Sequence, residues 1–264
     1  MPRIPRMLIF SLFILSVLPL QAQNVVKRIV ENGEIRIGTT AQQPPFSVKS
    51  KAGNVIGFDI DIALKLAEAI HVEANFIEMN FSELLEALDR GEIDMVVSGI
   101  TITPERNLKY LFAGPYLLSG KSILTKNRKL IQTPISELNT GRISVATLKG
   151  STSVTYVQKY LAATDLTLVD SYEDAVNMVI EGKIDMMLAD YSECAYASFR
   201  HQNHGLLIKE ELFSSEGIGI AIPASDPLLL NLVNNFISDL DDSGELKKIE
   251  DRWFRNGSWL AEVE

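Results

Sequence analysis

The chain has 264 residues, of which 46% are hydrophobic and 22% charged, enough for one large domain or two small ones with a substantial core. Its formal net charge of −9 argues against a nucleic-acid partner, because binding to phosphates requires clustered Lys and Arg. The single cysteine, Cys194, excludes an internal disulfide and a lipid-modified cysteine at a processed N-terminus, and the three histidines lack metal-ligand spacing, so we expect no metal and no cofactor.

The first residues have a pattern typical of a secretory signal peptide. Arg3 and Arg6 precede the apolar run MLIFSLFILSVLPL (7–20), and the small residue Ala22 follows it. The alternative, an uncleaved membrane anchor, needs about 20 apolar residues, and this run is shorter. We therefore predict a signal peptide over 1–22 and a periplasmic protein.

After this segment, strands and helices are predicted to alternate. The helix over 57–70 has apolar residues at helical spacing, with Asp59 placed to cap its start, and the next helix has Ser82 as its N-cap. The elements, in chain order, are a strand over 34–40, a helix over 57–70, a strand over 72–79, a helix over 81–91 and a strand over 93–100. The last strand is almost entirely apolar, as in a parallel sheet covered on both faces.

The same order repeats in the second half of the chain. Strands are predicted over 142–148, 166–170 and 184–190, with helices over 151–162 and 171–182 between them. The stretch RGEIDMVVSGIT (90–101) is similar to EGKIDMMLADYS (181–192), although G-x-I-D is also a common helix-to-strand turn. The matching element order favours a duplication, and hence an α/β fold of two βαβ lobes.

Two further segments are predicted to link the lobes. A strand-like stretch over 111–127 is broken by Gly114-Pro115, and a strand over 214–223 leads into a helical region over 226–254 with a break near Ser243-Gly244. This arrangement predicts a discontinuous lobe 1, over 23–115 and 214–264, and a lobe 2 over 116–213. Two crossings between lobes make a hinge around a cleft, the usual ligand position in open α/β sheets.

Polar side chains gather where the predicted strands end. Arg106 is suited to a planar carboxylate, because its guanidinium donates two parallel hydrogen bonds. Asp190 can accept from an ammonium, and the stretch KGSTS (149–153) opens a helix whose first N–H groups can receive an anion. Cation, anion and helix start together suit a zwitterion. The hydroxyl groups and the aromatic ring at these strand ends belong to Ser98, Thr101, Ser151, Thr152 and Phe81.

Each of these residues also has a purely structural interpretation. Arg106 and Asp190 can be solvated surface charges, Ser151 can be a simple N-cap, and Phe81 can be a hydrophobic cap. The sequence contains no G-x-S-x-G nucleophile motif and no phosphate-binding glycine pattern at a strand–helix junction. A binding function is therefore favoured over covalent catalysis.

The chain resembles the bacterial extracytoplasmic solute-binding proteins of family 3, the receptors of ABC importers for polar amino acids. The motifs that carry this resemblance are RIGTTAQQPPF (36–46), GFDIDIALKLAEAI (57–70), NFSELLEAL (80–88), IDMVVSGITITPER (93–106), KGSTS (149–153) and GIGIAIP (217–223). They cover essentially the whole chain after the predicted signal peptide, in the family's order. The resemblance implies a type II periplasmic binding protein-like fold, with a two-strand hinge between the lobes.

The resemblance also implies roles for individual residues. Arg106 is expected to hold the α-carboxylate of an amino acid, with help from Thr101, the Gly99 backbone and the backbone near Thr152. Asp190 is expected to hold the α-ammonium. Neither lobe then satisfies both ends of a zwitterion alone, so the ligand favours the closed state that a membrane permease recognises.

The side-chain pocket departs from the family's common patterns. Phe81 is expected to pack on the ligand side chain, and Thr40 and Gln43 stand where the family's first-lobe pocket residues lie. Members often have an acid in place of Thr40 and an aromatic residue in place of Gln43. Loss of the acid weakens the case for a basic ligand, so a polar neutral ligand such as glutamine is favoured and arginine stays open.

Two other functions are compatible with the resemblance. Cyclohexadienyl dehydratases resemble these receptors and eliminate water and CO₂ from carboxylated rings with a general acid in the cleft. Glu193 and Lys149 are the candidates for that chemistry, and both are expected to be solvated. A sensor or adhesin that reuses the fold without transport is the third alternative.

Overall fold

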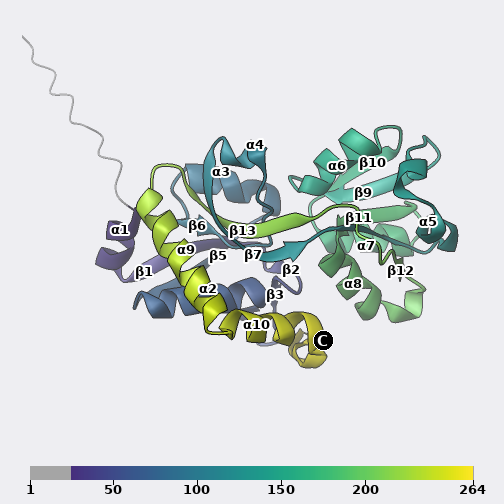
Figure 1. Cartoon of the computed structure of the whole chain (residues 1–264). Coiled ribbons are helices and arrows are strands. Elements are labelled where there is room, and N and C mark those ends of the chain that lie inside the picture. The colour runs from purple at the N-terminus through teal and green to yellow at the C-terminus, as the bar shows by residue number, and fades with distance from the viewer. Residues whose placement is uncertain (1–24, 264) are drawn as a thin grey trace, which may run out of the picture.

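The computed structural model describes residues 25–263, so the predicted signal peptide lies outside the described residues. Two lobes lie side by side, each built around a five-stranded sheet with helices packed against it (Figure 1). The strand order is β5-β1-β6-β13-β7 in the first sheet and β10-β9-β11-β8-β12 in the second. This arrangement confirms the α/β fold of two βαβ lobes.

The first lobe contains both the beginning and the end of the described chain. Its sheet consists of β1 (Glu34–Thr39), β5 (Glu73–Glu78), β6 (Met95–Val96), β7 (Tyr110–Ser119) and β13 (Glu216–Pro223). Its helices are α1 (Val25–Asn32), α2 (Phe58–Ala69), α3 (Leu84–Asp89), α4 (Pro104–Asn107), α9 (Pro227–Asp242) and α10 (Glu245–Glu250), with a 3-10 turn at Phe81–Glu83. A small antiparallel sheet is formed by β2 (Gln42–Gln43), β3 (Ser47–Lys49) and β4 (Val55–Ile56).

The second lobe consists of the middle of the chain. Its sheet contains β8 (Lys121–Thr125), β9 (Ser144–Leu148), β10 (Asp165–Val169), β11 (Met186–Asp190) and β12 (Leu207–Ile208). Its helices are α5 (Arg128–Gln132), α6 (Thr152–Tyr160), α7 (Tyr172–Ile180) and α8 (Tyr191–Arg200), with 3-10 turns at Ile135–Leu138 and Gln202–His204.

The two sheets share one plan. In each, the first strand of the βαβαβ unit lies between the second and the third, all parallel: β1 between β5 and β6, and β9 between β10 and β11. The fourth strand of each sheet is antiparallel to its neighbour, β13 beside β6 and β8 beside β11. The carboxyl ends of both parallel sets consequently supply the loops that face the other lobe.

The chain changes sheets twice. It passes from β7 through Gly120 into β8, and it returns after β12 to β13, which pairs antiparallel with β7. Gly114 and Pro115 lie inside β7, where the pairing with β13 shifts register, so the predicted break is a local irregularity within one strand that ends before Gly120. The lobe boundaries given from the sequence stay predictions.

Two predicted helix caps were wrong. Gly57, not Asp59, stands at the start of α2, and the Asp59 side chain is buried, where it accepts hydrogen bonds from the Gly99 amide and the Tyr116 hydroxyl. These two hydrogen bonds hold the Asp59 carboxyl group inside the lobe, away from the helix start. At the next helix Asn80, not Ser82, is the N-cap, because Asn80 forms a reciprocal capping box with the residue three positions later.

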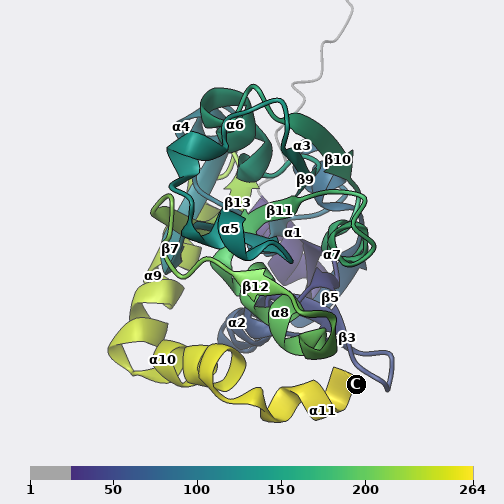
Figure 2. The ribbon, with the colours of Figure 1, turned by 90° about the vertical axis from the view of Figure 1, so that its right-hand side faces the viewer.

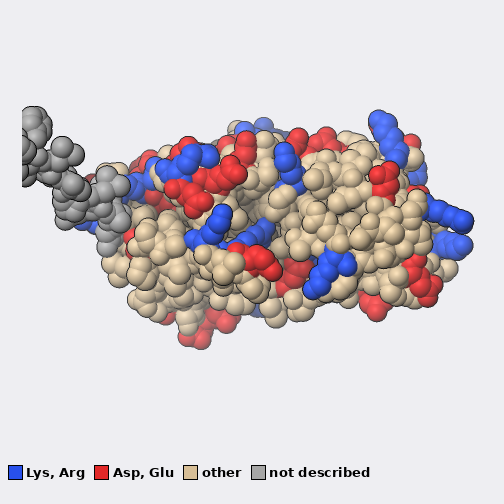
Figure 3. Space-filling view, turned by 90° about the horizontal axis from the view of Figure 1, so that it is seen from above, with Lys and Arg blue, Asp and Glu red and all other residues tan. Residues whose placement is uncertain are grey.

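The end of the chain contacts both lobes. After α10 it forms a π-helical turn (Asp251–Arg255), a 3-10 turn (Gly257–Trp259) and α11 (Leu260–Val263), which run below α8 in Figure 2. The Trp259 ring stacks on Tyr196 of α8 with 5.7 Å between centroids. Within 25–263 no helix is both long and apolar enough to cross a membrane. Acidic and basic side chains are interspersed on the face seen in Figure 3.

Candidate ligand-binding site

Arg106 lies between the two lobes. It belongs to the short helix α4, whose N-cap Thr103 accepts a hydrogen bond from the Arg106 amide at 3.2 Å. The guanidinium donates to the Thr101 carbonyl of its own lobe at 2.6 Å and to the Gly150 carbonyl of the other lobe at 3.1 Å. Its central carbon lies 6.0 Å from the centre of the Phe81 ring. Arg106 is therefore a half-buried cation of the cleft, and its alternative as a solvated surface charge does not hold.

The start of α6 faces Arg106 from the second lobe. Ser151 stands at the N-cap position of α6, but its hydroxyl donates to the Leu148 carbonyl at 2.7 Å and makes no capping hydrogen bond to the helix. The Thr152 hydroxyl lies 3.4 Å from that of Thr101 in the first lobe and donates to the Glu216 carboxylate at 2.9 Å. The predicted anion-receiving helix start and the predicted carboxylate clamp are thus brought together.

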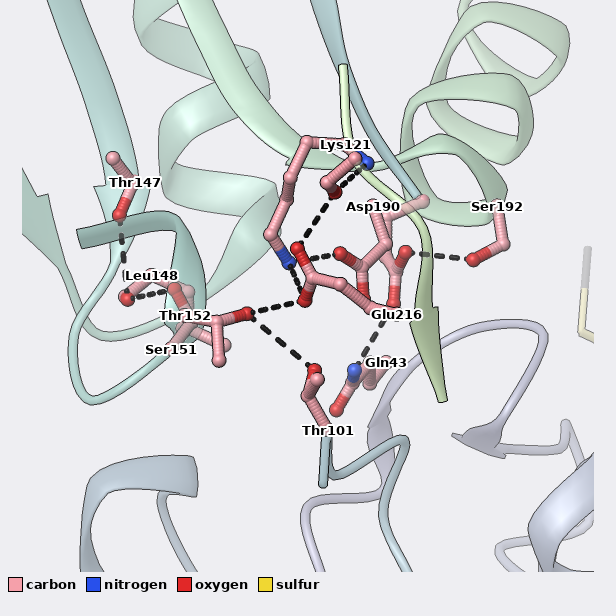
Figure 4. Close-up of polar contacts among 12 residues, drawn as sticks. Gln43, Thr101, Lys121, Thr147, Leu148, Ser151, Thr152, Asp190, Ser192 and Glu216 are labelled. Carbon is pink, nitrogen blue, oxygen red and sulfur yellow. Dashed lines mark hydrogen bonds and ion pairs between the residues drawn. The ribbon is translucent and has the colours of Figure 1, made fainter. Parts of the chain in front are cut away.

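Asp190 has a partner that the sequence did not reveal. It pairs across the strands β11 and β8 with Lys121, and the Lys121 ammonium forms an ion pair with the Asp190 carboxylate. The same ammonium lies 3.1 Å from a carboxylate oxygen of Glu216, at the start of β13 (Figure 4). Lys121 is only 1% exposed. Asp190 is therefore neither a solvated strand-end charge nor a free acceptor, because one of its oxygens is already bound to a lysine.

The ion pairs favour the charged forms of Lys121 and Glu216, whereas burial raises the pKa of Asp190 against the opposing effect of Lys121. Burial alone would lower the pKa of Lys121, but the carboxylates of Asp190 and Glu216 outweigh burial and raise it. Burial would raise the pKa of Glu216, but Lys121 and hydrogen bonds from Ser214 and Thr152 hold it below its usual range. Lys121 is accordingly a cation and Glu216 an anion at neutral pH.

Glu193 is buried in the cleft, so its predicted solvation was wrong. It lies in the first turn of α8 and is 2% exposed, and its carboxyl accepts hydrogen bonds from Gln43 of the first lobe at 3.0 Å and from Ser192 at 2.8 Å. Burial and then the nearby charge of Asp190 raise its pKa from 4.5 to about 8. Glu193 is therefore mostly protonated at neutral pH, whereas Lys149 is exposed as expected.

The loop at 98–99 is held by the first lobe. The Gly99 amide donates to Asp59 at 2.5 Å, so it is not available to a ligand carboxylate as the resemblance implied. Ser98 is buried, and its hydroxyl accepts from the Thr40 amide at 3.2 Å. These contacts make Gly99 and Ser98 supports of the site wall. Gln43 lies against this loop, with its amide carbonyl oxygen buried and without a hydrogen-bond partner among the described residues.

Two hollows lie between the lobes, one beside Phe81 and the other beside the Arg106 guanidinium. One is lined by predicted pocket residues and by the second lobe, namely Thr40, Gln43, Phe81, Leu148, Asp170 and Tyr172. The other is lined by Thr101, Arg106, Ser151, Thr152, Tyr156 and Glu216. Seven of the ten residues predicted for the site line these hollows, and Ser98, Gly99 and Asp190 lie behind the lining, next to Thr40, Gln43 and the ion pair of Lys121 and Glu216. Within 25–263 no group of three or more His, Cys, Asp or Glu side chains is arranged to hold a metal ion.

Sequence reasoning did not identify Lys121 and Glu216 as site residues, and it named Glu193 but missed its burial. Lys121 and Glu216 open apolar strands, KSILT and EGIGIAIP, and a lone charge at the edge of such a strand is the signal that could have singled them out. Glu193 is one helical turn beyond Asp190, which places both acids on the same side of the helix start. The burial of these side chains depends on contacts with the opposite lobe, and a local sequence pattern carries no information about such contacts.

Comparison with known proteins gives the family. Residues 35–256 match the Bacterial extracellular solute-binding proteins, family 3, and the chain belongs to this family. The L-cystine-binding protein TcyJ of Escherichia coli (strain K12) is 28% identical over 91% of this chain and 90% of its own length. The L-arginine-binding protein of Pseudomonas aeruginosa is 29% identical, with coverage of 83% and 87%, and the cyclohexadienyl dehydratase of the same species is 26% identical, with coverage of 96% of each chain.

Solved structures agree with this assignment. The ancestral amino acid-binding protein AncCDT-1, a precursor of cyclohexadienyl dehydratase, is 32% identical with a TM-score of 0.81, covering 88% of this chain and 100% of that one. An ancestral arginine-binding protein bound to glutamine is 32% identical with a TM-score of 0.79, covering 84% and 98%. The fold is thus that of the type II periplasmic amino-acid-binding proteins.

Replacement of Gly99 by Ala is expected to damage the site wall. Gly99 has a φ of +57°, and a Cβ atom there would lie 2.7 Å from the Gln43 side-chain nitrogen. The left-handed backbone alone costs about 1–2 kcal/mol, and displacement of Gln43 adds to it. Gly182→Ala is the matched control, since Gly182 has a φ of +71° with no atom near the added Cβ. Urea unfolding should show a larger loss of stability for Gly99→Ala, and equal losses would contradict the close packing.

Replacement of Glu193 by Gln is expected to flatten the pH dependence of stability. The folded protein keeps the Glu193 proton up to about pH 8, whereas an unfolded chain releases it near 4.5. Between these values the folded state binds more protons, so wild-type stability falls as pH rises. Without this titration the variant should lose less stability between pH 5 and 9, by about 4 kcal/mol.

Urea titrations of both proteins at pH 5, 7 and 9 measure this difference. Burial raises the pKa of Asp59 to about 7, so Asp59 contributes a fall with pH that both proteins share. Parallel curves for the two proteins would show that Glu193 does not hold its proton in the folded state.

Proposed function

We propose that the chain is an extracytoplasmic receptor that captures a polar amino acid between its lobes and delivers it to an ABC permease. The observation that carries the proposal is the position of the Arg106 guanidinium, which touches backbone carbonyls of both lobes beside the start of α6. A ligand carboxylate can replace the carbonyl partners with two parallel charge-assisted hydrogen bonds. The family membership and the names of the relatives, which include cystine- and arginine-binding proteins, support it.

The ammonium end of the ligand has hydrogen-bond acceptors in the ion cluster and in the hollow beside Thr40, Gln43 and Phe81, which we assign to the ligand side chain. Asp190 and Glu216 share one lysine, which leaves acceptor oxygens for an ammonium, and the unpaired Gln43 carbonyl oxygen offers another acceptor. Phe81 provides an apolar wall, since its ring lies in a buried cluster that includes Leu148 of the second lobe. These groups suit a polar amino acid with an uncharged side chain, such as glutamine.

Closure follows from contacts divided between the lobes. Gln43 with Glu193, Arg106 with the Gly150 carbonyl, and Thr101 with Thr152 join the lobes directly. A ligand that adds bonds to both sides binds the closed state preferentially. Moving an open-to-closed balance from 1:99 to 99:1 takes about 5.5 kcal/mol of differential binding. We propose that a permease recognises this closed form at the periplasmic face of the membrane.

Arg106→Ala tests the carboxylate clamp. Removal of the guanidinium leaves the ligand carboxylate desolvated without its partner, at an expected loss of about 2–5 kcal/mol in binding free energy. Isothermal titration with glutamine measures the loss. Arg90→Ala is the control, since Arg90 is an exposed arginine of the same lobe that pairs with Glu92. Unchanged affinity in the Arg106 variant would reject its assigned role.

A dehydratase activity is the second candidate, and Glu193 is the observation that favours it. A protonated carboxyl group buried in the cleft is the general acid that such a reaction needs. Its proton would pass to the leaving hydroxyl group, which departs as water, while the bond to the ring carboxylate breaks and its electrons form the new double bond as CO₂ leaves. The similarity to cyclohexadienyl dehydratase over 96% of both chains supports this candidate.

Turnover of prephenate and arogenate distinguishes the candidates. If the protein is an enzyme, purified protein should consume one of them, and Glu193→Gln should reduce the rate by about 10²-fold or more. Lys149→Gln should leave the rate unchanged, because Lys149 is exposed. Binding of an amino acid without any turnover would reject the dehydratase and favour the receptor.

A further inference from the structure

The floor of the site is a buried ion cluster whose geometry is fixed by the fold. Lys121 stands opposite Asp190 in the antiparallel register of β8 and β11, and both side chains are buried. The Lys121 amide donates to the Ser214 hydroxyl at 3.1 Å, and the same hydroxyl donates to the Glu216 carboxylate at 2.7 Å. Figure 4 shows the Lys121 ammonium between the two carboxylates. The Lys121 side chain is therefore fixed in the buried cluster and cannot easily move to an exposed position.

The charges of the site cancel. Arg106 and Lys121 are cations, Asp190 and Glu216 are the carboxylates paired with Lys121, and burial keeps Glu193 neutral. A zwitterion adds no net charge to this balance. A ligand with a further cation brings one charge more than the buried acids can pair, and an unpaired buried charge is strongly unfavourable.

The hollow for the ligand side chain offers little compensation. Thr40 stands there, together with Gln43, Phe81 and Tyr172, and none of these carries a negative charge at neutral pH. Asp170 lies at its rim but is exposed, so water and salt screen its charge. A cationic side chain in this hollow would therefore lose hydration without gaining a buried anion.

We infer that Lys121 is a specificity-determining residue that restricts the site to ligands without net positive charge, such as glutamine, and disfavours arginine. The inference rests on the proposed amino-acid binding and names the ligand class of that site. Lys121 does this by neutralising one of the two carboxylates, Asp190 and Glu216, so that the cluster keeps a single negative charge, which the α-ammonium of the ligand takes up. Removal of the lysine charge leaves two buried carboxylates with one cation, so the preference should move toward cationic ligands.

Isothermal titration of glutamine and arginine against four proteins tests the inference. The wild type should bind glutamine at least tenfold more tightly than arginine. Lys121→Met should move this ratio at least tenfold toward arginine, whereas Lys121→Arg should retain the wild-type preference because it keeps the charge. Lys209→Met is the matched control, since Lys209 is a second buried lysine of the same lobe that donates to the Ile131 and Thr133 carbonyls outside the cleft.

The outcomes separate the inference from the proposed function. Wild-type protein that binds arginine as tightly as glutamine overturns the inference and leaves the receptor function standing, even if the Lys121→Met variant fails to fold. An unchanged ratio in a folded Lys121→Met protein, or an equal shift in Lys209→Met, also overturns it. Failure of both ligands, and of the other amino acids, to bind the wild type overturns the receptor function and the inference with it.

Discussion

The ion cluster of Lys121, Asp190 and Glu216 is the interaction on which the arrangement of the site depends. Three separate chain segments meet there: the first strand after the hinge, the last parallel strand of the second lobe and the strand that returns to the first lobe. Each charge alone would be very costly to bury, and each is stable there because the others are present. The cluster therefore fixes the floor of the cleft and determines which acceptor groups remain for a ligand.

Around this floor, the two lobes contribute groups of different kinds. The first lobe brings a guanidinium, an aromatic ring and a primary amide, and the second brings the start of a helix and a neutral carboxyl group. Direct hydrogen bonds already join the lobes, so ligand binding strengthens an existing contact surface. A receptor uses this contact to report that the cleft is filled, whereas an enzyme would use the buried proton of Glu193 for chemistry.

Much of the fold follows from local patterns in the sequence. Helical spacing of apolar residues and apolar strands predict the βαβαβ units, and the repeated Gly and Ile-Asp-Met motif indicates that the design occurs twice. The loops that line the cleft can also be predicted, because ligands bind beyond the carboxyl ends of parallel strands. Arg106 and Thr152 are correctly brought together on these grounds. The cap at Asp59 was wrong, since a buried amide outweighed the local preference, and Gly114-Pro115 shift the register with β13 without ending the strand.

The sequence by itself determined the class of fold, the family and the loops that form the cleft, because periodicity and motif order are properties of neighbouring residues. Only the tertiary structure decided the electrostatic state of the site. Whether Asp190 is a free acceptor depends on a lysine 69 positions away, and whether Glu193 is charged depends first on its burial, to which the opposite lobe contributes Gln43, 150 positions away. Burial and charge pairing arise from contacts between distant segments, and these contacts determine the ligand chemistry that the cleft accepts.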